Sequence, residues 1–159
     1  MLFRSALVDG GAHRVIVGTS AFTGNGVNHG LLAEIAAAVT PARVLIAVDS
    51  KGGRITVKGW TESTELTAEQ AIQDLAPYCS GFLCTYVDKE GMLQGTDLDW
   101  FRRLRAATPL DLTAAGGITT YEDVQALLDM QIHAALGMAI YTGRLDLARL
   151  AAMNQAPAG

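Results

Sequence analysis

The feature that most constrains the fold is a series of five short apolar runs, each followed by a loop. Runs 14–18, 43–49 and 81–85 are apolar without alternating polar residues, which is typical of strands buried on both faces. We place the ends of the five strands at Gly18, Asp49, Thr85, Ala115 and Gly137. Successive ends lie roughly 20 to 40 residues apart, which leaves room for a helical crossover in each interval. The sequence therefore predicts a parallel sheet built from consecutive strand–helix units.

Helix-start signals occur in these intervals. Thr67 with Gln70 and Thr119 with Glu122 have the spacing of a capping box, which predicts helices over about 68–77 and 120–129. Helical patterns also cover 31–39 and 97–107.

One insertion interrupts the second strand–helix unit. Gly52-Gly53 can form the tight turn of a hairpin between 48–51 and 54–57, and this hairpin would rise above the strand ends. We expect a single domain over 1–153 and a flexible tail over 154–159.

Composition narrows the classes of partner. Of the 159 residues half are hydrophobic and 18% are charged, with a net charge of −4, so nucleic acid is not an expected partner. No run is long enough to span a bilayer and no secretory signal is visible, so we expect a cytoplasmic protein with no membrane partner. Cys79 and Cys84 lack a metal or redox spacing, and Cys84 is predicted to be a buried thiol. The scattered His13, His29 and His133 are interpreted as structural.

Two glycine-containing turns indicate a ligand. Gly116-Gly117 and Gly137 each follow an apolar run and precede a helix-like segment. Backbone N–H groups at such turns can converge on an anion, and (β/α)₈ barrels often build a phosphate site from the loops after strands seven and eight. Glycine after a strand is also a common turn residue, so the turns alone leave both interpretations open.

Taken in order, a set of motifs resembles one family. The segments VIVGTSAF, VLIAVDSKGGRITVKGW, CTYVDKEGML, LTAAGGIT and ALGMAIYTGRLDL resemble phosphoribosylformimino-5-aminoimidazole carboxamide ribotide isomerase of histidine biosynthesis, over about 6–150. The resemblance implies a (β/α)₈ barrel that needs no cofactor and no metal. It also implies an Amadori-type rearrangement of an aminoaldose to an aminoketose, on a small molecule with a phosphate at each end.

The same resemblance assigns catalytic roles to individual positions. It implies that Asp49 is the general acid, that Thr85 holds a substrate oxygen or orients a carboxylate, and that Trp60 stacks over the imidazole of the substrate. Glu90 stands where the family usually carries aspartate. Taken alone, Asp49 could instead cap the hairpin turn, Thr85 could be an ordinary strand residue, and Trp60 could pack on the barrel rim.

Glycine positions also map onto the family pattern. The resemblance implies one phosphate cup at Gly116, Gly117 and Gly137, and one side of a second cup at Gly18 and Thr19. One departure is Met138, where most relatives have an arginine that could pair with phosphate.

The motifs cover strands four to eight of the barrel only. The resemblance implies a catalytic aspartate on the first strand of the family's barrel, which has no counterpart in this sequence, and we expect Asp9 in a helix-to-strand turn at the opposite end of the barrel. A partial barrel exposes two sheet edges and an apolar interior, and the mean hydropathy is +0.24. We therefore expect a chain that is inactive alone and that forms a homo-oligomer or pairs with an N-terminal half-barrel. Two alternatives remain open: a non-catalytic phosphate-binding half-barrel, and a related phosphoribosylanthranilate isomerase.

Overall fold

The computed structural model describes residues 2–24, 26–59, 61–89 and 95–155. Its centre is a set of five parallel strands, each paired with the next one in the series. In spatial order they are β1 (Val15–Val17), β4 (Val44–Lys51), β7 (Gly81–Tyr86), β8 (Asp111–Ala115) and β9 (His133–Ala134). The predicted parallel order of five consecutive strands is confirmed.

The end of the last strand differs from the prediction. β9 ends at Ala134 rather than at Gly137, although the N–H of Ala135 still donates to the carbonyl of Ala114 at 2.8 Å. Gly137 has φ −123° and ψ −100° and precedes a helix, so its backbone has already left the extended conformation.

The helices over 29–39, 68–75, 98–107 and 121–129 fall where the helical patterns predict them, whereas no bounds were predicted for the other three described helices. In chain order the helices are α1 (Leu2–Asp9), α2 (His29–Val39), α3 (Ala68–Leu75), α4 (Leu98–Ala107), α5 (Tyr121–Asp129), α6 (Met138–Tyr141) and α7 (Leu147–Gln155). Short 3₁₀ turns are η1 (Thr19–Ala21), η2 (Pro41–Arg43), η3 (Ala76–Tyr78) and η4 (Val87–Lys89). α7 includes residues 154 and 155 of the segment expected to be a tail, and 156–159 lie outside the described residues.

One of the two predicted capping boxes is displaced by a residue. Thr67 and Gln70 cap α3 as expected. At α5 the capping pair is Thr120 with Asp123, and not Thr119 with Glu122. Thr119 is only 6% exposed, while Thr120 has the extended backbone that a cap position needs.

The predicted hairpin is present and makes the sheet mixed. Gly52 and Gly53 have φ values of 56° and 79°, which suit a tight hairpin turn. They join β4 to the antiparallel β5 (Arg54–Val57), which pairs in turn with β6 (Glu62–Ser63). A separate antiparallel pair is formed by β2 (Phe22–Thr23) and β3 (Gly26–Val27).

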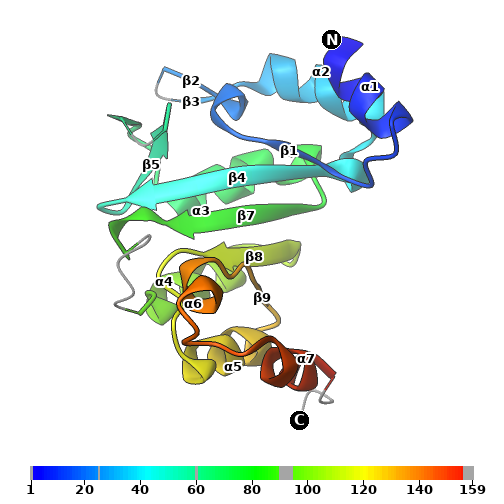
Figure 1. Ribbon diagram of the computed structural model, residues 1–159. Coiled ribbons are helices and arrows are strands. Elements are labelled where there is room, and N and C mark those ends of the chain that lie inside the picture. Colours follow the sequence, from blue (N-terminus) through cyan, green and yellow to red (C-terminus); the bar gives the residue numbers. More distant parts are fainter. Residues whose placement is uncertain (1, 25, 60, 90–94, 156–159) are drawn as a thin grey trace.

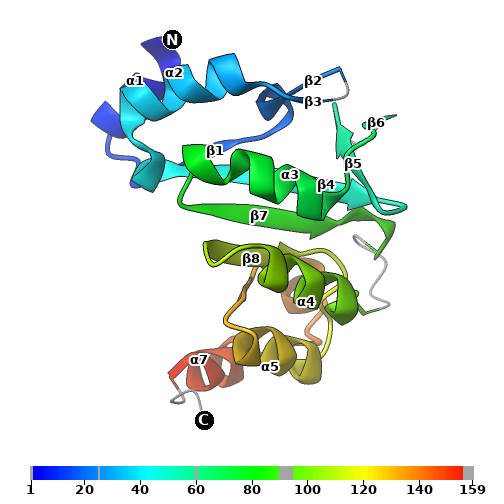
Figure 2. The ribbon, with the colours of Figure 1, turned by 180° about the vertical axis from the view of Figure 1, so that it is seen from behind.

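The two faces of the sheet differ in how they are covered. α3 and α4 lie on one face, toward the viewer in Figure 2 and behind the sheet in Figure 1. Val44, Ile46 and Val48 of β4 are buried, and the alternate side chains of the strand are only half-buried. On β1, Ile16 is 57% exposed. In the described residues β4 is therefore fully buried only on the face covered by α3 and α4, whereas burial on both faces was expected. We call the opposite face, which carries Ile16 and the half-buried alternate side chains of β4, the open face.

The architecture is a mixed α/β fold with a mainly parallel central sheet, consistent with a TIM-type fold. β1 and β9, at the two ends of the parallel set, are not paired with each other in the part of the chain that the structure describes. Among the described helices, none has both the length and the apolar character required to cross a bilayer.

Candidate functional site

Two of the predicted catalytic side chains lie next to each other at the carboxyl edge of the sheet. Asp49 on β4 is the register partner of Thr85 on β7, which is in turn the partner of Ala115 on β8. Register partners place their side chains on the same face, with strands about 4.8 Å apart. Asp49 and Thr85 are half-buried and alternate with the helix-facing residues, so both lie on the open face.

Asp49 does not occupy the hairpin turn. It is paired with Thr56 across the β4–β5 ladder, and its carbonyl accepts a hydrogen bond from the Thr56 hydroxyl at 3.3 Å. A carboxylate oxygen of Asp88, in η4, accepts the N–H of Gly52 in the turn at 2.8 Å. Asp49 therefore lies in the ladder before the turn, and the carboxylate that contacts the turn backbone at Gly52 is that of Asp88. Asp88 was missed by sequence reasoning, because its contact depends on how two loops approach each other.

The hairpin is tied at a second point. The N–H of Lys58, which has φ +52°, donates to the hydroxyl of Thr19 at 3.0 Å. Thr19 follows Gly18 at the carboxyl end of β1, at the start of η1. The hairpin therefore crosses from the loop after β7 to the loop after β1. The role of Gly18 and Thr19 in a phosphate cup stays a prediction.

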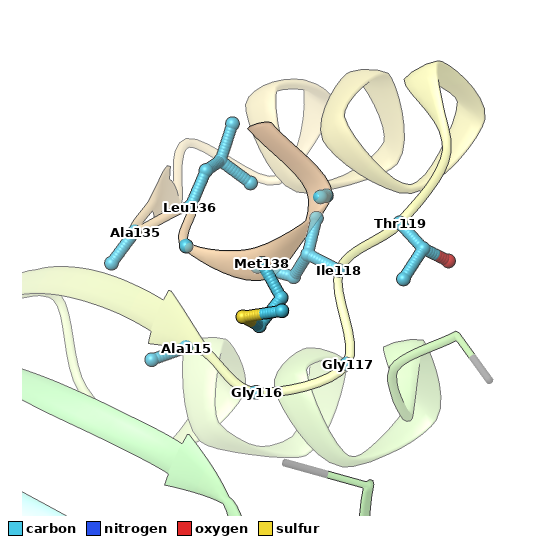
Figure 3. Close-up of a pocket in the computed structure, with 10 residues that line it drawn as sticks. Ala115, Gly116, Gly117, Ile118, Thr119, Ala135, Leu136 and Met138 are labelled. Atoms are coloured by element: carbon cyan, nitrogen blue, oxygen red, sulfur yellow. The ribbon is translucent and has the colours of Figure 1, made fainter. Parts of the chain in front are cut away.

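A pocket of about 270 Å³, which we call the glycine pocket, lies where the two glycine turns were predicted to meet. It is lined by Ala115, Gly116, Gly117, Ile118, Thr119, Ala135, Leu136, Gly137, Met138 and Ala139, and Figure 3 shows the two loops facing each other. Gly116 and Gly117 have φ values of 93° and 74°, a conformation that favours glycine. None of these lining residues carries a charge.

Backbone donors at this pocket are available to a ligand. None of the hydrogen bonds within the described part of the chain has the N–H of Gly116, Gly117 or Met138 as its donor. Consecutive backbone N–H groups in such turns form concave sites that suit anions. The pocket can therefore offer several neutral donors to an oxyanion.

Other predicted residues fall into separate groups. Trp60 and Glu90 lie outside the described residues. Cys84 is buried as predicted, and burial raises the pKa of its thiol above the ordinary range. Burial raises the pKa of Cys79 to about 11. His29 is within 3.1 Å of the Tyr78 hydroxyl. In the described segments no three His, Cys, Asp or Glu side chains gather closely enough to hold a metal ion.

Comparison with known proteins gives a consistent result. A family model described as histidine biosynthesis protein matches residues 4–146. A 1-(5-phosphoribosyl)-5-((5-phosphoribosylamino)methylideneamino) imidazole-4-carboxamide isomerase from Myxococcus xanthus is 39% identical, over 91% of this chain and 60% of its own length. Proteins with the same name from Nitratidesulfovibrio vulgaris and Methanocaldococcus jannaschii are 36% and 32% identical, over 59% and 58% of their lengths. The chain thus spans about three fifths of these relatives.

Proposed function

Because the chain belongs to the histidine biosynthesis protein family, we propose that it carries much of the active site of an aminoaldose–aminoketose isomerase. The substrate is a ribotide with two phosphoribosyl groups, as in the name of the relatives. The observation that carries the proposal is the pairing of Asp49 with Thr85 at the carboxyl edge of a parallel sheet, on the same edge as the glycine pocket. Active sites of TIM-type barrels lie at this edge.

The proposed chemistry needs an acid and a base. Asp49 donates a proton to the ring oxygen of the aminoaldose, so that the ring carbon–oxygen bond breaks while the amine lone pair forms a C=N bond. A base then removes the proton from the neighbouring carbon, which gives an enol. The enol hydroxyl loses its proton, the former imine carbon gains one, and the aminoketose results.

Three further side chains support this reaction in the proposal. The Thr85 hydroxyl holds a substrate oxygen or orients the Asp49 carboxylate. The second role is possible because Thr85 is the register partner of Asp49 on the neighbouring strand. Glu90 assists proton transfer, and Trp60 stacks over the imidazole of the substrate. No position of this chain matches the first-strand aspartate of the family, so we assign the base to additional polypeptide.

The phosphates of the substrate are assigned to the two glycine sites. Gly116, Gly117 and Gly137 hold one phosphate through backbone N–H groups, which is supported by the pocket and by the two positive φ values. Gly18 and Thr19, at the end of β1, hold the other. These sites lie toward opposite ends of the parallel set of strands, as a substrate with a phosphate at each end requires.

The open face supports the proposal that 1–153 is one domain forming five of the eight strands of a TIM-type barrel. In a closed barrel this face would be the packed interior, but here Ile16 is 57% exposed. Covering a few hundred Å² of such surface would contribute several kcal/mol, at roughly 25 cal/mol per Å². We therefore propose that a second copy, or a segment with the missing strands, covers the open face.

A reconstitution experiment tests the catalytic assignment. Turnover of the ribotide is measured for this chain alone and for this chain mixed with the part of the Myxococcus relative that it does not cover. We expect activity in the mixture, and a loss of 10²-fold or more for Asp49→Asn. The matched control is Asp111→Asn, on the open face at the opposite end of the strands, which should keep activity within about twofold. Equal activity of the two variants would refute the role of Asp49.

A second experiment tests the open face. Sedimentation of the isolated chain should show a dimer or larger species with little or no turnover, since burial of the open face favours association. A compact monomer near the 16.8 kDa chain mass with efficient turnover would contradict the partial-barrel proposal.

A further inference from the structure

Met138 stands out among the residues that line the glycine pocket. It is 50% exposed, one of a few large hydrophobic side chains with such exposure among the described residues. Figure 3 shows its side chain lying across the space between Ala115 and Ile118. An exposed thioether at the mouth of a pocket is available to contact whatever enters.

The charge of the pocket makes this contact important. None of the described residues that line it carries a charge, and the chain as a whole has a net charge of −4. An anion in this pocket would therefore be held by neutral backbone donors without a paired cation, and such hydrogen bonds are weaker than charge-assisted ones. Contacts to the part of the ligand that is not the anion would add to this affinity.

The apolar part of the lining can supply that affinity. Ile118 is almost completely buried, while Leu136 and Met138 remain accessible from the pocket. Methionine is unbranched and polarizable, so its side chain adapts to irregular apolar surfaces. Carbon atoms attached to a bound phosphate would lie where the Met138 side chain can pack against them.

We infer that Met138 is a specificity-determining residue that makes this pocket prefer organic phosphomonoesters to inorganic phosphate. The inference rests on the proposed phosphate site at Gly116 and Gly117. The anion contacts the backbone N–H groups, and the thioether of Met138 covers the carbon chain of the ester. The ligand class is therefore a phosphate ester whose first few carbon atoms are not shielded by further charge.

The test is a titration of the 159-residue chain with inorganic phosphate, methyl phosphate and propyl phosphate, followed by the amide NMR shift of Gly117. We expect propyl phosphate to bind about fivefold more tightly than methyl phosphate, because two more methylene groups become partly buried. Met138→Ala should abolish this difference and leave the affinity for inorganic phosphate within about twofold. Met138→Arg should strengthen binding of inorganic phosphate by about tenfold or more.

A control variant and two outcomes separate the inference from the proposed function. Tyr141→Ala removes an 87% exposed side chain of the same helix that does not line the pocket, and it should leave all affinities unchanged. If no phosphate compound shifts Gly117 in any variant, the phosphate site itself is wrong. If inorganic phosphate binds but the chain-length effect is absent or survives Met138→Ala, the phosphate site stands and the role of Met138 is overturned.

Discussion

Gly81→Ala should destabilise the protein strongly, because β7 and β8 leave no room for a side chain at this position. A Cβ atom at Gly81 would lie 2.6 Å from the carbonyl oxygen of Asp111 and 2.7 Å from its Cβ. Ordinary contacts begin at 3.4 Å, so the two atoms would have to separate by roughly 0.7 to 0.8 Å. The carbonyl oxygen belongs to the main chain of the register partner and the Cβ is bonded directly to that main chain, so both atoms can move only if the ladder opens.

The expected cost follows from this geometry. Overpacking in a core typically costs about 1 to 3 kcal/mol, and the lost ladder hydrogen bond adds about 1 kcal/mol. We therefore expect a loss of about 3 kcal/mol in the free energy of unfolding, which corresponds to a fall of about 6 to 12 °C in Tm for a chain of this size. Urea and thermal unfolding followed by circular dichroism measure both quantities.

A matched glycine gives the control for this experiment. Gly30 is exposed in the first turn of α2, and a Cβ there would meet nothing within 4 Å. Gly30→Ala should leave stability unchanged or raise it by up to about 1 kcal/mol, since alanine favours the helix. Gly81→Ala within about 0.5 kcal/mol of the wild type would refute the argument, because the close pairing of β7 with β8 would then be wrong.

Three further predictions concern the hairpin, a helix cap and the thiols. Asp88→Ala should speed hydrogen–deuterium exchange at the Gly52 amide with little change in global stability, because it removes the acceptor of that N–H. Asp74→Ala, on the exposed side of α3, should not affect the Gly52 amide, and unchanged exchange in Asp88→Ala would contradict the contact. Thr120→Ala should lower the free energy of unfolding, measured by chemical denaturation, by about 1 kcal/mol, and Glu122→Ala should lower it by less than about 0.5 kcal/mol. The reverse order would indicate that Thr119 and Glu122 form the capping pair instead. Cys79 and Cys84 should resist a thiol reagent at pH 8 until the chain unfolds, and rapid labelling of the folded chain would contradict their burial. The free energy of unfolding should also fall as pH rises from about 9 toward 11, because the Cys79 thiol loses its proton at lower pH in the unfolded state than in the folded state.

Local signals predicted most of the elements. The apolar runs at 14–18, 43–49 and 81–85 indicate strands because they are short and apolar, and Gly52-Gly53 indicates a turn that needs two positive φ values. The α5 cap was misplaced because TTYED contains two overlapping pairs with the same spacing. The choice between them depends on which threonine is buried, and that is decided by packing rather than by the local sequence.

The candidate site was predictable only in part, for a similar reason. Neighbouring parallel strands bring their ends to one edge, so strand ends at Asp49 and Thr85 were enough to expect the two side chains side by side. The pocket at Gly116 and Gly117 likewise follows from two turns after adjacent strands. The contact of Asp88 with Gly52 and the exposure of the open face depend on tertiary approach and on which helices cover the sheet, and no short-range pattern encodes either.

The glycine pocket has a consequence for how this chain can diverge. Its donors belong to the main chain, so substitutions of the surrounding side chains change the rim of the pocket without removing a single N–H group. The positions that must remain glycine are 116 and 117, because few other residues adopt their φ values of 93° and 74°. Substitution of Met138, Leu136 or Ile118 could therefore change which molecules the pocket binds, while the backbone N–H groups of the pocket stay in place.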